Sequence, residues 1–331
     1  MVITKTPFRM SFFGGGTDYA EFYKKYGGSV ISTTFDKYCY VTARHLPRFF
    51  DYSTQIAYSR VENVSSLDEI VHPSVRETMR FLDMKQLHIS YDADLPARTG
   101  LGSSSSFVVG MLNGFYAIKG KYVDKKRLAE EAIHIERVLC NEDGGVQDQI
   151  AAAYGGFNRI VFSEEGFVVN PIVMREERKH LLNKQLMLFF TGFSRFSSDI
   201  AKSQKKATKS KTQELKEMLS LVEEAEKILL DSKADLNEFG RLLHDSWTIK
   251  RGLTKEISNN SIDAVYKKAM DAGALGGKLL GAGGGGFLLF YVEQDKQDRV
   301  RNCLSDLLYV PFQFENDGTR IIYYAAEAFE D

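Results

Sequence analysis

Residues 95–106 constrain the fold of this chain more than any other stretch, because they join a glycine-hinged turn to the start of an apolar helix. Their sequence is Leu-Pro-Ala-Arg-Thr-Gly-Leu-Gly-Ser-Ser-Ser-Ser. Gly100 and Gly102 allow backbone angles that a Cβ forbids, and the serines open a helix whose first N–H groups have no internal partner. The helix dipole adds about half a positive charge there. The segment therefore predicts an anion site, and phosphate suits it best.

The neighbouring segments favour this interpretation over a flexible glycine-serine linker, which composition alone leaves open. Residues 87–93 alternate polar and apolar side chains as a strand does, and residues 107–118 are strongly apolar. The stretch is therefore predicted to be a strand, a loop and a helix in that order.

The composition is that of an ordinary soluble protein, with 331 residues, of which 44% are hydrophobic and 26% charged. This length predicts two domains, which we place at residues 1–184 and 185–331, where the character of the sequence changes. The net charge of −1 argues against a general nucleic-acid binder. The three cysteines have no metal-ligand spacing, and no apolar stretch is long enough to cross a membrane, so we expect a cytoplasmic protein.

A second glycine segment, Pro7–Tyr19, lies near the N-terminus and contains Phe-Phe-Gly-Gly-Gly-Thr-Asp. Its glycines allow a close backbone approach to a ligand, and Asp18 then presents a carboxylate at the start of a predicted helix over 20–26. A tight turn with a capping aspartate explains the same residues without any function. Residues 2–6 predict one strand and residues 29–46 predict two more.

Two acidic residues stand out on the helices predicted after the serine run. The helix over 124–140 carries one apolar stripe, and Glu136 lies one residue off it, at the edge of the buried face. A carboxylate at such an edge meets either solvent or a cation. Asp148 falls in the first turn of a short helix, which is a favourable position for any acid and commonly nothing more.

The second half of the chain predicts an α+β arrangement. An apolar strand at 185–191 and a lysine-rich stretch at 202–211, which is typical of a solvated face, precede amphipathic helices and a glycine tract at 276–286. The tract contains the dinucleotide pattern G-x-G-x-x-G, but that pattern needs a helix after it, and a strand at 287–292 follows instead. We therefore reject a dinucleotide site.

Three glycine-bearing segments, in this order, resemble the motifs of the GHMP small-molecule kinases, the superfamily of galactokinase, homoserine kinase and mevalonate kinase. Pro7–Tyr19 resembles the N-terminal substrate motif, Pro96–Ser104 the phosphate loop, and Lys278–Gly286 the C-terminal glycine motif. Gly145–Gln149 is similar to the segment with the family's catalytic aspartate. The resemblance covers essentially the whole chain. It implies a two-domain α+β fold, with an N-terminal domain like ribosomal protein S5 domain 2 and a C-terminal ferredoxin-like α/β sandwich.

One departure narrows the resemblance to sugar-phosphate kinases. Galactokinase carries Glu-His where this chain has Gly15 and Gly16, so the contacts of those side chains to galactose are absent. The Gly-Gly-Gly-Thr-Asp version instead resembles the D-glycero-D-manno-heptose 7-phosphate kinases of bacterial heptose biosynthesis, and fucose kinase domains carry a related motif. The resemblance implies transfer of the ATP γ-phosphoryl group to the anomeric hydroxyl of heptose 7-phosphate, giving the 1,7-bisphosphate on the route to nucleotide-activated heptose.

The resemblance also implies roles for individual residues, in line with the positioning and charge neutralisation that phosphoryl transfer requires. Asp148 would orient or deprotonate the sugar hydroxyl, with Arg9 beside it to offset transition-state charge. Ser104 and Glu136 would hold Mg²⁺ as hard oxygen donors. The residues expected to bind ATP are Arg98, Thr99, Gly100, Leu101, Gly102, Ser103, Ser104, Ser105, Gly283 and Gly284. Those expected to bind the sugar phosphate are Gly15, Gly16, Thr17, Asp18, Arg195, Ser197 and Lys278.

The loop at 191–198 is our hypothesis for the site of the substrate's own phosphate. Arg195 offers a planar fork suited to phosphate oxygens, and Ser197 adds a hydroxyl. Arg98 is a weaker candidate because it sits inside the ATP loop. A surface arginine on a mobile turn remains the alternative.

Two other functions stay open at this point. A kinase for an unphosphorylated hexose such as fucose would differ only in lacking a cationic cradle for a distal phosphate. A sugar-phosphate-binding regulator without catalysis would lose the acid and metal positions, and the presence of Asp148, Glu136 and Ser104 favours an enzyme. The expected partners are ATP and a sugar phosphate, without nucleic acid or membrane, and the oligomeric state is not predicted.

Overall fold

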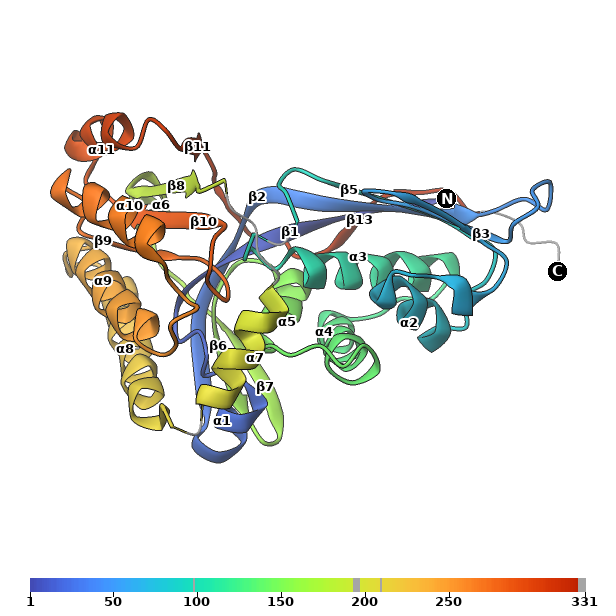
Figure 1. Ribbon diagram of the computed structural model, residues 1–331, viewed down its shortest axis with the longest axis horizontal. Helices are drawn as coiled ribbons and strands as arrows, with labels where there is room; N and C mark the ends of the chain where they lie inside the picture. Colours follow the sequence, from blue (N-terminus) through green and yellow to red (C-terminus); the bar gives the residue numbers. More distant parts are fainter. Residues whose placement is uncertain (98, 193–196, 209, 327–331) are drawn as a thin grey trace.

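The computed structural model describes residues 1–97, 99–192, 197–208 and 210–326, and in this part of the chain helices lie against two β-sheets (Figure 1). The first sheet has the strand order β13-β1-β2-β5-β3-β4, with β12 and β6 also paired to β2 and β7 paired to β6. Its strands are β1 (Val2–Phe13), β2 (Gly28–His45), β3 (Thr54–Ala57), β4 (Val61–Val64), β5 (Leu87–Ala93), β6 (Phe157–Ser163), β7 (Gly166–Pro171), β12 (Phe314–Glu315) and β13 (Arg320–Tyr324). The second sheet has the order β11-β8-β10-β9. Its strands are β8 (Leu186–Phe190), β9 (Gly276–Leu279), β10 (Phe287–Tyr291) and β11 (Leu308–Val310).

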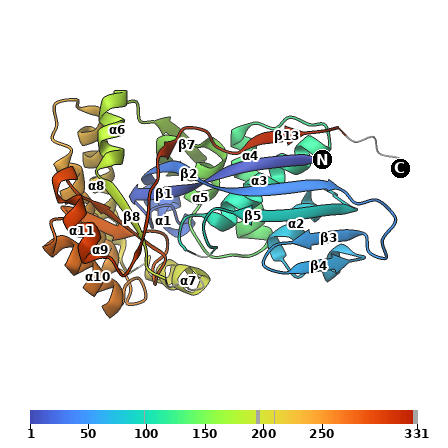
Figure 2. The same ribbon diagram turned by 90° about the horizontal axis from the view of Figure 1, so that it is seen from above.

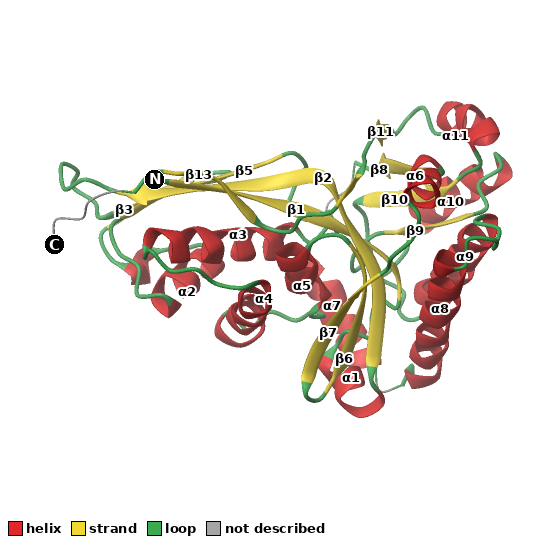
Figure 3. Ribbon diagram, turned by 180° about the vertical axis from the view of Figure 1, so that it is seen from behind, coloured by secondary structure: helices red, strands yellow, loops and turns green. Residues whose placement is uncertain are grey.

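Helices pack against both sheets. They are α1 (Ala20–Tyr26), α2 (Pro73–Phe81), α3 (Ser103–Ile118), α4 (Lys125–His134), α5 (Gln147–Tyr154), α6 (Glu176–Lys184), α7 (Ser197–Ala207), α8 (Thr212–Leu230), α9 (Asn237–Arg251), α10 (Asn260–Asp271) and α11 (Gln297–Cys303), with short turns at η1 (Leu67–Glu69), η2 (Ile135–Leu139) and η3 (Gln294–Lys296). Helices α2, α3, α4 and α5 lie together on one side of the first sheet (Figure 3). Among the described residues, no helix combines the length and the apolar character that a membrane span requires.

Helix α3 is the apolar helix that the sequence predicts after the glycine-serine loop, and it begins at Ser103. It packs closely on β1 because two of its residues are glycines. A Cβ on Gly110 would lie 2.9 Å from Thr6 Oγ1, and the carbonyl of Gly110 accepts a hydrogen bond from Thr4 Oγ1 at 3.1 Å. This close contact brings the first turn of α3 to the middle of β1.

The long strands β1 and β2 differ from their prediction. A single strand, β2 (Gly28–His45), replaces the two strands predicted over 29–46. Asp36 and Lys37 lie in a bulge within it, without partners in β1: Pro7 pairs with Tyr38, but the next residue pairs with Phe35. Pro7 sits at this bulge, where a proline is tolerated within a sheet. Strand β1 therefore continues through Phe13 and carries its residues to the second sheet.

The end of the chain returns to the first sheet. Strand β13 pairs with β1 at the sheet edge, and Figure 2 shows these two strands from above. Strand β12 pairs with β2. The predicted α+β character is confirmed. The division of the chain at residue 184 stays a prediction.

The two sheets meet at a cluster of aromatic rings around Phe12. Its ring is stacked on that of Phe157 of β6, with 5.4 Å between the ring centroids, and lies edge-on to that of Phe239 of α9, with 5.5 Å between the centroids. Phe12 is fully buried. The contact joins β1 to the helix that covers the second sheet.

Phe12→Ala should lower the free energy of unfolding by about 3–5 kcal/mol, because it removes buried ring contacts and leaves a cavity. Chemical denaturation measures this value. Phe49→Ala is the matched control, since Phe49 is 92% exposed, and it should change the same free energy by less than about 0.5 kcal/mol. Similar values for the two variants would contradict the packing described for Phe12.

Candidate active site

Arg9 and Asp148 form an ion pair that joins β1 to the first turn of α5. Arg9 Nε and Nη2 donate to Asp148 Oδ1 and Oδ2, each at 2.8 Å. Arg9 is 5% exposed, whereas the side chain of Asp148 is 24% exposed, so the carboxylate keeps contact with solvent. Two parallel charge-assisted hydrogen bonds hold a carboxylate in one orientation. The structure thus brings together the two residues that we expected to be catalytic.

The predicted phosphate loop lies directly on this pair. Arg9 Nη1 donates to the carbonyl of Gly100 at 2.7 Å, and the backbone N–H of Arg9 donates to the carbonyl of Leu101 at 3.1 Å. A Cβ on Gly102 would lie 3.3 Å from Arg9 Cγ and 3.4 Å from Asp148 Oδ2. Gly102, with φ of +76°, is the N-cap of α3, so the unpaired N–H groups of that helix begin beside the carboxylate. The anion site and the acid, predicted from separate stretches, are adjacent.

The glycine segment after β9 packs its backbone on the phosphate loop. A Cβ on Gly281 would lie 2.3 Å from Gly100 Cα, and a Cβ on Gly286 would lie 2.2 Å from the carbonyl oxygen of Thr99. No side chain fits at either position. The second sheet therefore supplies one wall of the phosphate loop.

Asp18 of the first glycine segment is turned toward α5 rather than toward α1. It accepts hydrogen bonds from Gly16 N at 2.9 Å and from Gln147 Nε2 at 3.0 Å. Burial raises the pKa of its carboxyl, and the negative charge of Asp148 acts in the same direction. A Cβ on Gly145 would lie 1.8 Å from Asp18 Oδ2, so only glycine fits there. The residue after Asp18 is the N-cap of α1, so a capping role for Asp18 is wrong.

Thr17, expected to bind substrate, stabilises the glycine segment itself. Its buried Oγ1 lies 2.8 Å from the carbonyl oxygen of Gly14 and 2.9 Å from that of Ser29, and it accepts the Ser29 N–H at 3.1 Å. These contacts tie the segment to β2. Thr17 therefore shapes the loop that contains Gly15 and Gly16.

Glu136 is buried beside the first turn of α3 and is not at the edge of a buried face as predicted. The helix over 124–140 is α4 followed by a π-helical turn, η2. Glu136 lies four residues after the buried Ala132, on the same helix face, and is 1% exposed. It accepts hydrogen bonds from Ser105 Oγ at 2.8 Å and from Gln149 Nε2. Ser104, expected to share a metal ion with Glu136, is exposed.

The oxygen atoms around Glu136 fit a magnesium ion. Gln149 Oε1 is buried without a hydrogen-bond partner, and it joins the Glu136 carboxylate and the Ser105 hydroxyl, all donors of the kind that Mg²⁺ prefers. Within the described ranges, no group of three His, Cys, Asp or Glu residues is placed to hold a metal. An ion here would therefore complete its shell with hydroxyl, amide, water or phosphate oxygens.

Two lysines from the second half of the chain are buried near Arg9. Lys250 of α9 is 6% exposed and its Nζ donates to the carbonyl of Gly281 at 2.6 Å. Lys278 of β9 is 1% exposed, and its Nζ donates to the carbonyl of Phe12 at 2.6 Å. Burial and the positive charge of Arg9 lower the pKa of Lys250 to about 8. Burial and the positive charges of Lys250 and Arg9 lower the pKa of Lys278 well below its usual value. Lys278 was predicted to bind substrate, and Lys250 was not predicted.

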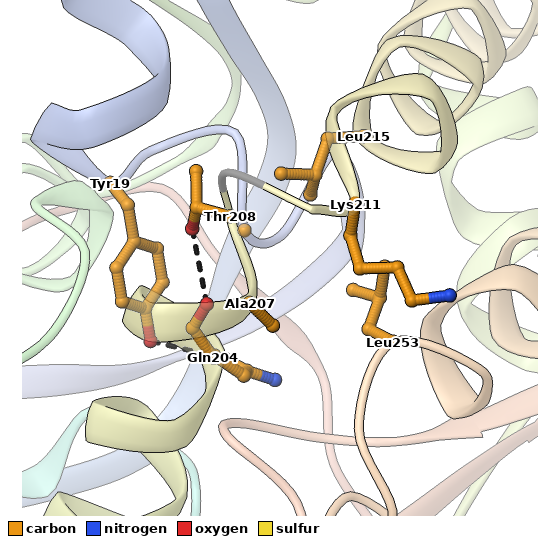
Figure 4. A pocket seen from close by; sticks show the side chains of 8 residues that line it. Tyr19, Gln204, Ala207, Thr208, Lys211, Leu215 and Leu253 are labelled. Carbon is orange, nitrogen blue, oxygen red and sulfur yellow. Dashed lines mark hydrogen bonds between the residues drawn. The ribbon is translucent and has the colours of Figure 1, made fainter.

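Helix α7 connects the first glycine segment to the segment after β9. Tyr19 OH donates to Gln204 Oε1 and Gln204 Nε2 donates to the carbonyl of Ala282, both at 3.1 Å. Figure 4 shows Tyr19 and Gln204 pointing toward one another in the wall of a pocket that also reaches Gly16 and Leu253. This pocket opens beside the predicted substrate loop.

The other residues predicted for the site lie either at the edge of the site or outside the described residues. Gly283 and Gly284 lie against Ile257, whose carbonyl accepts the Gly284 N–H at 3.0 Å. Arg98 and Arg195 lie outside the described residues, as does the side chain of Ser197, with which α7 begins.

Comparisons with known proteins agree with the order of these motifs. The family model for the GHMP kinases N terminal domain matches residues 69–156, and that for the GHMP kinases C terminal domain matches residues 221–310. A D-glycero-alpha-D-manno-heptose 7-phosphate kinase of Campylobacter jejuni is 30% identical, covering 96% of this chain and 97% of its own. An L-fucokinase/L-fucose-1-P guanylyltransferase of Bacteroides fragilis is 29% identical over 65% of this chain and 23% of its own.

A solved structure shares the whole architecture. The D-glycero-D-manno-heptose 1-phosphate kinase from Bacteroides thetaiotaomicron superposes with a TM-score of 0.80 at 26% identity, covering 98% of this chain and 100% of its own. These matches confirm the fold class that the sequence predicts.

Gly145→Ala should lower the free energy of unfolding by about 1–3 kcal/mol, the usual cost of overpacking a buried site, because its methyl group would displace Asp18. Gly252→Ala is the matched control: Gly252 has φ of −80°, and a Cβ there meets its nearest atom at 3.4 Å. Thermal or chemical unfolding compares the two variants. If Gly145→Ala were as stable as Gly252→Ala, the contact between Asp18 and residue 145 would be refuted.

Proposed function

The chain belongs to the GHMP kinase family, and from this premise we propose that it transfers the γ-phosphoryl group of ATP to the anomeric hydroxyl of D-glycero-D-manno-heptose 7-phosphate. The product would be the 1,7-bisphosphate. As a family member the protein is a phosphotransferase with an alcohol group as acceptor, and its heptose phosphate kinase relatives support a sugar-phosphate kinase. The finer choice of substrate, and of ATP as the phosphoryl donor, is our proposal. A cytoplasmic location stays a prediction.

One observation carries the proposal: the carboxylate of Asp148 lies against the phosphate loop at Gly102. Phosphoryl transfer needs little covalent chemistry from the protein, so rate enhancement comes from positioning and charge stabilisation. A nucleotide phosphate bound at the start of α3 would lie next to the group that orients the attacking hydroxyl. The Arg9 guanidinium donates to both oxygens of that carboxylate and adds a positive charge beside the phosphate loop.

In the reaction, Asp148 would accept a hydrogen bond from the sugar hydroxyl and receive its proton as the oxygen attacks the γ-phosphorus. Gly100 and Gly102 let the backbone approach the phosphates, and the N–H groups at the start of α3 face them. Asp18 is held by Gln147 beside this point and would orient sugar hydroxyls.

Glu136, with Ser104 or Ser105 and Gln149, would hold Mg²⁺, which supplies charge neutralisation for the phosphates when bound. The same residues would also order the first turn of α3 through the bond between Ser105 and Glu136.

The distal phosphate of the substrate needs a binding site of its own. The loop at 191–198, with Arg195 and Ser197, remains our candidate for it. The support is the similarity to the Campylobacter jejuni heptose 7-phosphate kinase over nearly the whole chain.

A kinase for an unphosphorylated sugar is the second candidate, favoured by the similarity to the Bacteroides fragilis fucokinase. An assay of ADP release over heptose 7-phosphate, heptose 1-phosphate, sedoheptulose 7-phosphate, fucose and galactose separates the candidates. We expect the highest kcat/KM with heptose 7-phosphate. A higher value with fucose would replace the proposal, and no turnover with any sugar would refute it.

Asp148→Asn should lower kcat by about 10² or more with a modest change in KM, because the lost interaction is strongest in the transition state. Steady-state kinetics with heptose 7-phosphate and ATP measures both constants. The matched control is Asp298→Asn, since the Asp298 side chain is 89% exposed on α11, and it should keep native kinetics. A variant at residue 148 that retained most of its turnover would remove Asp148 from the mechanism.

A further inference from the structure

Three basic side chains and two carboxylates meet at the transfer site. The basic side chains are Arg9, Lys250 and Lys278, and the carboxylates are Asp18 and Asp148. All of them except Asp148 are less than a tenth exposed. Burial disfavours the charged form of the two lysines. An anionic ligand beside a buried lysine would favour its charged form.

The three basic side chains differ in what they can still bind. Arg9 directs three N–H groups to the aspartate and to the phosphate loop. Lys278 is 1% exposed and is bonded to a carbonyl of β1. Lys250 Nζ makes one hydrogen bond within the described ranges, to Gly281, whereas an ammonium group carries three protons. Lys250 therefore has donors left for a ligand.

The hydroxyl of Ser11 in β1 and Lys250 Nζ approach the same part of the first glycine segment. Its Oγ is buried and has no hydrogen-bond partner in the described part of the chain. A Cβ on Gly15 would lie 3.8 Å from Ser11 Oγ and 4.0 Å from Lys250 Nζ, so both groups approach one point of the first glycine segment. A buried hydroxyl without a partner is unfavourable, and a ligand oxygen would supply the missing hydrogen bond.

We propose that Lys250 Nζ and Ser11 Oγ form an oxyanion site that binds the phosphoryl group during its transfer, an inference that rests on the proposed function. The site lies between the two substrates. Gly15 belongs to the predicted sugar segment, and Gly281, which holds Lys250, is in backbone contact with Gly100 of the phosphate loop.

The atoms of the step balance without a further reactant. The sugar oxygen forms a bond to the γ-phosphorus, and the bond from phosphorus to the β,γ-bridging oxygen breaks, with its electron pair leaving on ADP. The hydroxyl proton passes to Asp148. Lys250 and Ser11 neutralise charge on a non-bridging oxygen, as preorganised donors do in a desolvated site.

Proton uptake on nucleotide binding tests the inference, measured by titration calorimetry with Mg²⁺ and AMPPNP in buffers of different ionisation enthalpy. The charged groups that face Lys250 are Arg9, Asp18, Asp148 and Lys278. An anion beside Lys250 raises its pKa from about 8. At pH 8 the native protein should therefore take up roughly half a proton more per analogue than Lys250→Arg, because arginine stays charged.

The control is Lys255→Met, which removes an exposed lysine just beyond the same helix and should show native uptake. Equal uptake by the native protein and Lys250→Arg would overturn the inference, as would uptake on adding heptose 7-phosphate but not AMPPNP.

Ser11→Ala should lower kcat by about 10-fold at unchanged KM for both substrates, as expected for one lost transition-state hydrogen bond. A protein that binds no AMPPNP would refute the nucleotide part of the proposed function itself, whereas binding without the difference in uptake refutes only the oxyanion site.

Discussion

The two-point contact between Arg9 and Asp148 is the interaction on which the rest of the site depends. Arg9 lies in β1 and is paired with Thr34 of the long strand β2, so the sheet fixes the backbone from which its guanidinium extends. Through Gly100 the same side chain supports the phosphate loop. Removing Asp148 would leave the charge of the buried Arg9 without its carboxylate partner. The first sheet thereby fixes α5 and the loop relative to each other.

Backbone contacts between glycines make the site common to both sheets. The β9–β10 connection approaches the phosphate loop so closely that a Cβ on Gly100 would lie 2.4 Å from the carbonyl oxygen of Leu280. This approach also brings α9, and with it Lys250, to the segment that carries Gly15. The first sheet supplies the acid and the phosphate loop, and the second supplies a cation next to them.

Local sequence patterns predicted the parts of the site that are encoded in short stretches. The loop at 95–106 and the helix after it follow from glycine and helix-start chemistry over a few residues. The role expected for Asp148 came from the resemblance to the GHMP kinases, because an acid in the first turn of a helix has no function of its own to indicate. Glu136 was placed at the edge of the buried face because the apolar stripe was drawn toward Leu139, which is 38% exposed, whereas the buried face of this helix includes Ala129. Lys250 was missed because its neighbours at the site come from β1, from the first glycine segment and from the β9–β10 connection. The sequence indicates its burial only through its spacing, because Lys250 falls on the same helix face as Leu243 and Trp247.

A double-mutant cycle between Arg9 and Asp148 tests most directly whether the two residues act as one unit under the phosphate loop. The cycle compares kcat/KM of Arg9→Met, of Asp148→Asn and of the double variant. Residues that act as a unit are strongly non-additive, so we predict that the double variant is within about 3-fold of the worse single variant. A double variant whose loss equals the product of the two single losses would contradict this account.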